Sequence, residues 1–127
     1  MGDHLFAYGF LMRRFHGNMQ TKTPAFEAEF VAEGLYPGLI YRVDVYPGVI
    51  YTDDGSLVRG EIFKLTNPTE ALAVLDQYEN SLPLVTYNPD YQRRLRSIRT
   101  GQRKIDCWVY EYLKPIDPAL QIHSGQF

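Results

Sequence analysis

One segment of this 127-residue sequence has the periodicity of a helix, and no other feature constrains the fold as much. In "NPTEALAVLDQYEN", residues 67–80, Asn67 suits the N-cap, Pro68 suits the first helical position and Glu70 completes a capping box. The apolar side chains fall on one side of the helical wheel: Ala71, Leu72, Val74, Leu75 and Tyr78. The sequence therefore predicts one amphipathic helix, residues 68–79, packed on a sheet.

The rest of the sequence consists largely of short β-prone segments. "HLFAY", residues 4–8, is a continuous apolar run, as expected for a central strand covered on both faces. "AFEAEFVAEG", residues 25–34, alternates with the period of two of a half-buried strand, and Gly34 is expected to end or bulge it. Ten tyrosines and seven phenylalanines suit such pleated surfaces.

Turn signals separate the later β-prone segments. We expect turns at Pro37-Gly38, Pro47-Gly48 and Asp54-Gly55. "YQRRLRSIRTGQRKIDCWVYEYL", residues 91–113, reads as two strands joined around Gly101. The aromatic residues Trp108, Tyr110 and Tyr112 are predicted on one face of the second strand.

Length and charge narrow the class of protein. The length fits a single domain, residues 1–127, and the formal net charge of -2 argues against a nucleic-acid partner or an anionic membrane surface. Cys107 cannot form an internal disulfide and is expected to be a small core residue. Nothing at the N-terminus reads as a signal peptide or membrane span, so we expect a soluble, cytoplasmic protein.

A local cluster of basic residues stands out against the balanced composition. For these residues a solvated strand face is favoured over a phosphate-binding patch: Arg93, Arg94, Arg96, Arg99, Arg103 and Lys104. The sequence has no phosphate loop, dinucleotide fingerprint or nucleophile elbow. The histidines occur singly, without the spacing of a metal site. We therefore expect neither a cofactor nor a metal.

The helical wheel places one carboxylate on the apolar side, because Glu79 falls between Leu72 and Leu75. Burial and the negative potential of a helix C-terminus would both raise the pKa of this carboxyl. Glu79 either turns outward with the helix end or pairs with an arginine such as Arg93, or it is a general base poised nearer neutrality. Asp76, at the edge of the face, is expected to be solvated or to cap the helix.

Six motifs in order carry a resemblance: "YGFL", "YPG" at residues 46–48, "VRGEIF", "LDQYEN", "YQRR" and "WVYEY". With them the sequence resembles the gamma-glutamylcyclotransferase-like family from Leu5 to the terminal "IHSGQF", most closely the gamma-glutamylamine cyclotransferase branch and its small bacterial and plant relatives. The resemblance implies an α+β fold, with a mixed, barrel-like β-sheet, one main packed helix and short flanking helices. Five core residues are expected to be buried: Phe6, Ile62, Leu72, Leu75 and Val109.

The resemblance also implies a site. The family binds the glutamyl part of its substrate largely through backbone groups of a Tyr-Gly-Ser/Thr-Leu loop, and the loop here is Tyr8, Gly9, Phe10 and Leu11. Gly9 would let main-chain amides approach a carboxylate without a side chain in the way. The family's catalytic glutamate falls on Glu79, the residue that the helical wheel singles out independently.

The implied reaction is an intramolecular aminolysis. The alpha-amine of a gamma-glutamyl amine or peptide attacks its own side-chain carbonyl, and the products are 5-oxoproline and a free amine, as in an enzyme of acyltransferase or lyase type. Glu79 would be the general acid and base.

Three departures from the family pattern concern the substrate: Phe10 replaces a small hydroxyl residue, Asn80 a common glycine, and Gln126-Phe127 a common Asp-Trp. Phe10 favours a second hypothesis, a non-catalytic small-molecule-binding module on the same fold. A third, a β-barrel that binds single-stranded nucleic acid through arginines and tyrosines, is weakened by the net charge. The expected partner is a small molecule with a gamma-glutamyl group, and the sequence predicts no oligomeric state.

Overall fold

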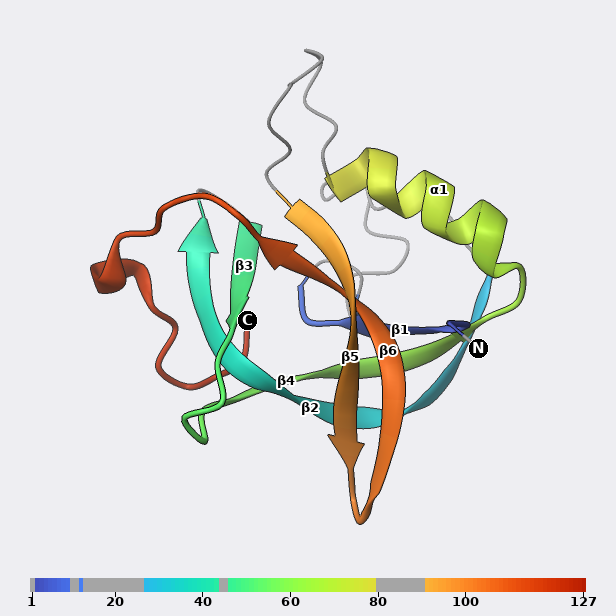
Figure 1. Cartoon of the computed structure of the whole chain (residues 1–127), viewed down its shortest axis with the longest axis horizontal. Coiled ribbons are helices and arrows are strands. Elements are labelled where there is room, and N and C mark those ends of the chain that lie inside the picture. The colour runs from blue at the N-terminus through green and yellow to red at the C-terminus, as the bar shows by residue number, and fades with distance from the viewer. Residues whose placement is uncertain (1, 10–11, 13–26, 44–45, 80–90) are drawn as a thin grey trace.

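The computed structural model describes residues 2–9, 12, 27–43, 46–79 and 91–127, apart from the side chains of Tyr46 and of residues 77–79. Figure 1 shows the elements, whose bounds are β1 (His4–Ala7), β2 (Ala28–Val43), β3 (Tyr46–Tyr51), β4 (Leu57–Leu65), α1 (Pro68–Glu79), β5 (Tyr91–Thr100), β6 (Arg103–Tyr112) and a short 3₁₀ helix, η2 (Pro118–Leu120). In these residues no helix is long and apolar enough to cross a membrane.

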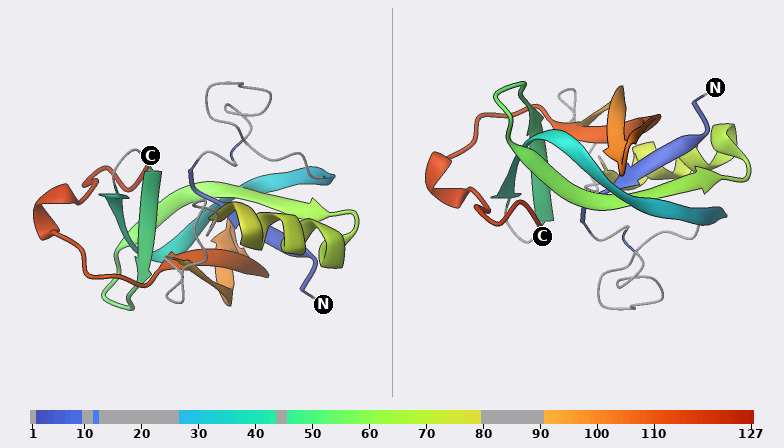
Figure 2. Two further views of the ribbon diagram at one scale, coloured as in Figure 1. Left: turned by 90° about the horizontal axis from the view of Figure 1, so that it is seen from above. Right: turned by 90° about the horizontal axis from the view of Figure 1, so that it is seen from below.

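The strands close into a barrel. β1 lies between β4, which is antiparallel to it, and β6, which is parallel. β4 pairs with β2, β2 with β3 and β3 with β6, so the ring of pairings returns to its start. β5 forms an antiparallel hairpin with β6 and meets β2 where Leu35 lies opposite Arg99. The mixed, barrel-like sheet predicted from the sequence is confirmed, and α1 lies outside it (Figure 2).

The barrel wall separates two apolar clusters. The cluster inside the barrel consists of Phe6, Tyr8, Tyr36, Ile40, Val49, Val58, Ile62, Ile98, Cys107 and Val109. The cluster between the wall and the helix consists of Leu5, Ala7, Met12, Phe63, Leu65, Ala71, Leu72, Leu75, Tyr91 and Tyr110. Alternate residues of a strand point to opposite faces, so β1 contributes to both clusters and is covered on both faces as predicted. The five residues expected in the core are all buried.

The helix has the predicted bounds, Pro68–Glu79. At its start the side-chain amide of Asn67 donates to the Glu70 carboxylate at 3.0 Å, so the two residues meet through their side chains. Val74, predicted on the apolar side, is 38% exposed. The buried arc centres on Leu75, which is fully buried, and Val74 lies about 100° away from it around the helix.

Two of the expected turns lie inside strands. Pro37-Gly38 is part of β2, and Pro47-Gly48 is part of β3. A Cβ atom on Gly38 would lie 2.5 Å from the carbonyl oxygen of Ile50, so glycine is needed there for close packing between strands rather than for a turn. The turn at Asp54-Gly55 is confirmed, because Gly55 has a φ of +94° and the Ser56 amide donates to the Asp54 carboxylate.

From the sequence, Gly34 is expected to end or bulge the second strand. Instead, β2 continues past Gly34, and the irregularity in its pairing lies between Phe30 and Ala32. The strand continues to Val43 because its first part, residues 28–37, pairs with β4 while residues 38–43 pair with β3. This long, bent strand therefore joins two parts of the barrel wall (Figure 2).

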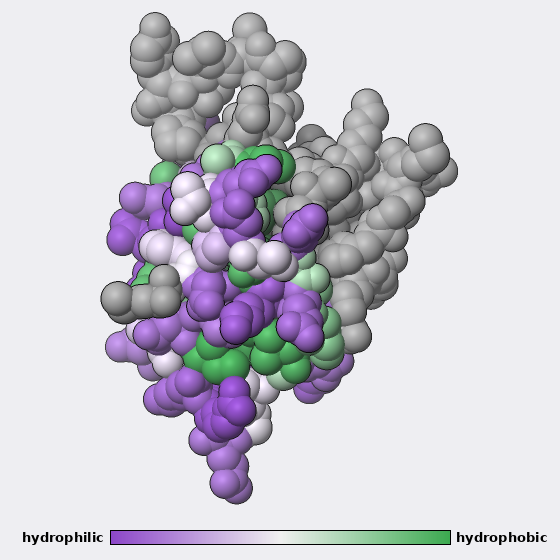
Figure 3. Space-filling model, turned by 90° about the vertical axis from the view of Figure 1, so that its right-hand side faces the viewer, coloured by the Kyte–Doolittle hydropathy of each residue, from purple (hydrophilic) through white to green (hydrophobic). Residues whose placement is uncertain are grey.

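The β5–β6 hairpin turns at Gly101, as predicted, with a φ of +59°. Arg99, Arg103 and Lys104 near its tip are exposed, and the projecting tip is hydrophilic in Figure 3. A solvated face is confirmed for these residues. Arg93 and Arg96, further from the tip, are half-buried and paired with carboxylates.

Candidate functional site

The described part of the predicted binding loop is Tyr8 and Gly9, which follow β1 and are buried. Phe10 and Leu11 lie outside the described residues. The Tyr8 hydroxyl donates to the carbonyl oxygen of Tyr110 in β6. The amide of Met12 donates to the carbonyl oxygen of Gly9 at 3.0 Å. The first bond fixes Tyr8 to the barrel, and the second links Met12 to Gly9.

Gly9 packs directly against Pro47 in β3. A Cβ atom on Gly9 would lie 2.6 Å from Cγ of Pro47, closer than real Cβ contacts. The φ of Gly9 is not positive, so space rather than backbone conformation requires the glycine. The Pro47 carbonyl in turn accepts a hydrogen bond from the Tyr91 hydroxyl at 2.8 Å. The loop, the start of β3 and the start of β5 therefore meet at one end of the barrel.

Glu79 is the last residue of α1, and its side chain lies outside the described part of the structure. Asp76, in the same last turn, is tightly bonded. Its Oδ1 atom accepts from the Tyr110 hydroxyl at 2.6 Å and from Nε of Arg93 at 2.9 Å, and its Oδ2 atom accepts from Nη2 of Arg93 at 3.1 Å. Asp76 was expected to be solvated or to cap the helix. Its side chain is 43% exposed, but its carboxylate also binds two strands of the barrel, which the sequence analysis did not predict.

Tyr110 joins the two predicted parts of the site. Its carbonyl oxygen accepts from Tyr8, directly before Gly9, and its hydroxyl donates to Asp76, three residues before Glu79. The side chain is 3% exposed and belongs to the cluster under the helix. The structure thus brings the loop after β1 and the last turn of α1 to the same end of β6 (Figure 1).

A second carboxylate network, which the sequence analysis missed, lies on the other face of the hairpin. Glu111 is 6% exposed and accepts from the Tyr36 hydroxyl at 2.6 Å and from Nε and Nη2 of Arg96 at 2.7 and 3.0 Å. The Arg96 guanidinium lies 3.9 Å from the centre of the Tyr51 ring. The sequence could have predicted that Glu111 points into the barrel, because it follows the buried Cys107 and Val109 with the two-residue period of one strand face.

Burial shifts two pKa values inside the barrel. Burial, followed by the hydrogen bond to Glu111, holds the pKa of the Tyr36 hydroxyl well above its usual range. Burial raises the pKa of the Cys107 thiol to about 12. Cys107 is fully buried, which confirms it as a core residue, and a thiol with so high a pKa is a poor nucleophile.

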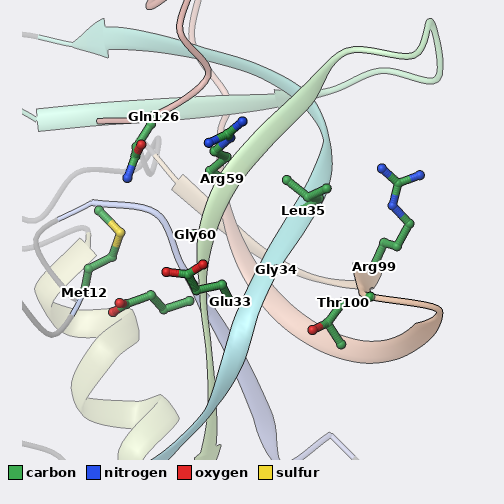
Figure 4. Close-up of a pocket in the computed structure, with 11 residues that line it drawn as sticks. Met12, Glu33, Gly34, Leu35, Arg59, Gly60, Arg99, Thr100 and Gln126 are labelled. Carbon is green, nitrogen blue, oxygen red and sulfur yellow. The ribbon is translucent and has the colours of Figure 1, made fainter.

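A hollow of about 400 Å³ opens on the outer face of β2 and β4 (Figure 4). Glu33 and Glu61 lie opposite each other across these strands, and Arg59 and Arg99 also line the hollow. Tyr8 and Gly9 do not line it, but Met12 does. Among the residues described, no three His, Cys, Asp or Glu side chains gather as metal ligands, either here or at the barrel end.

The chain is similar to several known proteins. The model of the family described as "Gamma-glutamyl cyclotransferase, AIG2-like" matches residues 5–127. Among solved structures, YkqA from Bacillus subtilis has a TM-score of 0.69 and 17% identity, covering 100% of this chain and 40% of its own.

An AIG2-like protein from mouse has a TM-score of 0.66 and 23% identity, covering 93% of this chain and 81% of its own. PH0828 from Pyrococcus horikoshii has a TM-score of 0.61 and 18% identity, and the match covers 98% of this chain and 88% of PH0828. These likenesses show the shared fold, and this chain spans less than half the length of the Bacillus protein. A search of curated proteins gave no match.

Proposed function

This chain belongs to the AIG2-like gamma-glutamyl cyclotransferase family, and we propose that it converts a gamma-glutamyl amine or peptide to 5-oxoproline and a free amine. The observation that carries this proposal is the junction at Tyr110, which links the loop after β1 to the last turn of α1. A general base on the helix end and a backbone cradle in the loop must lie close together to act on one small substrate. The junction supports this proximity.

In the proposed reaction Glu79 takes a proton from the alpha-ammonium group of the substrate. The free amine attacks the gamma-carbonyl carbon, and a new C–N bond closes the five-membered ring. Glu79 returns the proton to the leaving nitrogen as the bond between that nitrogen and the carbonyl carbon breaks. The ring nitrogen then passes its second proton through Glu79 to the free amine, which leaves as an ammonium ion. Nucleophile and electrophile belong to one molecule, so the site's main task is to hold the folded conformer.

Backbone groups of the binding loop would hold the substrate carboxylate or the developing oxyanion. The proposal gives Gly9 two roles, packing on Pro47 and leaving the backbone open, and a double variant separates them. Gly9→Ala should weaken substrate binding, and adding Pro47→Ala removes the ring atoms that the new Cβ would meet. If the double variant recovers full binding, packing alone explains the glycine and the cradle is refuted.

The experiment that tests the function is a 5-oxoproline assay with a panel of gamma-glutamyl amines, gamma-glutamyl dipeptides and glutathione. Glu79→Gln should lower turnover by roughly a hundredfold or more, the scale of a lost general base, while substrate binding survives. Glu70→Gln is the matched control, because it removes a carboxylate from the exposed first turn of the same helix. It should leave turnover unchanged.

Two outcomes would contradict this assignment. A wild-type protein that binds these compounds without forming 5-oxoproline would be the non-catalytic binding module that Phe10 suggests. A Glu79→Gln variant that loses thermal stability and keeps full turnover per folded molecule would make Glu79 a structural residue.

A further inference from the structure

We propose that Asp76 is a positioning residue for the site, because its bonds to Arg93 and Tyr110 fix the last turn of α1, and with it Glu79, against the barrel. The inference rests on the proposed function in so far as Glu79 is the proton carrier. Asp76 itself is not placed in contact with the substrate. It acts through the helix.

Among the described side chains of α1, Leu75 makes the last apolar contact with the barrel, one residue before Asp76. Ala71, Leu72 and Leu75 are buried, whereas Val74 is 38% exposed. Asp76 is the last helical residue whose side chain the structure describes, and its carboxylate receives hydrogen bonds from β5 and β6. Helix ends fray unless bonded, so this polar contact adds to the apolar contact at Leu75 and holds the last turn of α1.

The spacing between Asp76 and Glu79 couples their positions. Residues three apart in a helix are surface neighbours, with Cβ atoms about 5–6 Å apart. A turn held at Asp76 therefore holds the backbone of Glu79 as well. Loss of the contact would leave the fold intact and release the end of the helix.

Arg93 is itself held in place on the barrel. Its guanidinium lies 4.5 Å from the centre of the Trp108 ring, and the Trp108 indole nitrogen donates to the carbonyl oxygen of Gly2 at 2.7 Å. The last turn of α1 contains no basic residue. Arg93 supplies from β5 the positive charge that a helix C-terminus favours. The Arg93 guanidinium binds both carboxylate oxygens of Asp76, and such a bidentate pair fixes the relative orientation of the two side chains as well as attracting them.

Catalysis is sensitive to such positioning, since a misplacement of about 1 Å can cost as much as a hundredfold in rate. Asp76→Ala should therefore lower kcat about tenfold while KM stays within about twofold. The kcat of Asp76→Asn should lie between those of the wild type and Asp76→Ala, because the amide oxygen can still accept the hydrogen bond from the Tyr110 hydroxyl. Arg93→Lys should retain more activity than Arg93→Gln.

Arg96→Gln is the matched control, because it breaks the corresponding arginine pair inside the barrel. It should lower the melting temperature and leave kcat per folded molecule unchanged. If Asp76→Ala behaves like this control, losing stability but not kcat, the positioning role is overturned. A rise in KM with kcat unchanged would overturn it too, since that is the pattern of a substrate-binding residue.

Hydrogen exchange measures the contact without any substrate. In Asp76→Ala, amides of residues 76–79 should exchange at least about tenfold faster, while those of residues 71–74 keep their protection. Unchanged exchange in the last turn would overturn the proposal even if activity fell. If the wild-type protein turned over no substrate, the proposed function would fail, and exchange alone would decide whether Asp76 holds the helix end.

Discussion

The β5–β6 hairpin has a carboxylate, an arginine and a tyrosine hydroxyl bonded together on each of its two faces. On the helix side Asp76 binds Arg93 and Tyr110, and inside the barrel Glu111 binds Arg96 and Tyr36. Each arginine also lies against an aromatic ring. The two networks differ in burial, because the side chain of Asp76 is 43% exposed and that of Glu111 is 7% exposed.

This difference in burial separates what the two networks do. A buried charge must keep all its partners, because removing one leaves the other unsatisfied in a medium of low dielectric constant. A half-exposed ion pair contributes little to stability, because water replaces either partner. The inner network therefore maintains the fold, whereas the outer network's main effect is geometric, on the end of α1.

The largest expected effect is on the inner carboxylate. Glu111→Gln should lower the free energy of unfolding by about 3 kcal/mol, because Arg96 then lacks its counter-charge. Asp76→Asn, the matched change outside the barrel, should lower it by about 1 kcal/mol or less. Urea unfolding of both variants measures the difference. Equal losses would show that burial does not distinguish the networks.

The tyrosines give the next comparison. Tyr36→Phe should cost about 2 kcal/mol, because Glu111 loses a hydrogen bond that water cannot replace inside the barrel. Tyr110→Phe should cost about 1 kcal/mol, because the Asp76 carboxylate remains accessible to solvent. The same unfolding measurement applies. A larger loss for Tyr110 would place the more critical network on the helix side.

Alkaline pH provides a smaller and separate effect. The folded-state pKa values of Tyr36 and Cys107 are raised, so their contribution to stability is complete at low pH and is lost as the pH rises. For Cys107 the loss should begin near pH 9 and continue to about 12, and for Tyr36 it should begin near pH 10. In the Tyr36→Phe and Cys107→Ala variants, the free energy of unfolding should fall less steeply with rising pH than in the wild-type protein. Unchanged curves would contradict the assigned burial.

The sequence predicted the helix, the central strand and the hairpin because each follows from local periodicity or turn chemistry. It failed at Pro37-Gly38 and Pro47-Gly48, where glycine serves close packing between strands. Whether a Pro-Gly pair turns the chain depends on the strand beside it. No short stretch of sequence contains that information.

The candidate site could be predicted only one residue at a time. The helical wheel pointed to Glu79 and the resemblance to the loop at Tyr8 and Gly9, but nothing in the sequence linked them through Tyr110. The prediction for Asp76 used only the periodicity of its own helix, whereas its partners come from strands more than 15 residues away along the chain. Side-chain partners across the fold require the register of β5 and β6.

The smallest expected effect is the response of the two ion pairs to salt. A double-mutant cycle with Asp76→Asn and Arg93→Gln should give a coupling free energy of about 0.5 kcal/mol at low salt. In 1 M NaCl the screening length falls to about 3 Å, so this coupling should approach zero. The corresponding cycle with Glu111→Gln and Arg96→Gln should change less, because the Glu111 side chain is 7% exposed, against 43% for Asp76. Coupling energies are the right measure because general effects of salt on stability cancel within each cycle. A salt-resistant Asp76–Arg93 coupling would mean that the outer pair is held as rigidly as the inner one, and the stability loss of Asp76→Asn should then exceed about 1 kcal/mol.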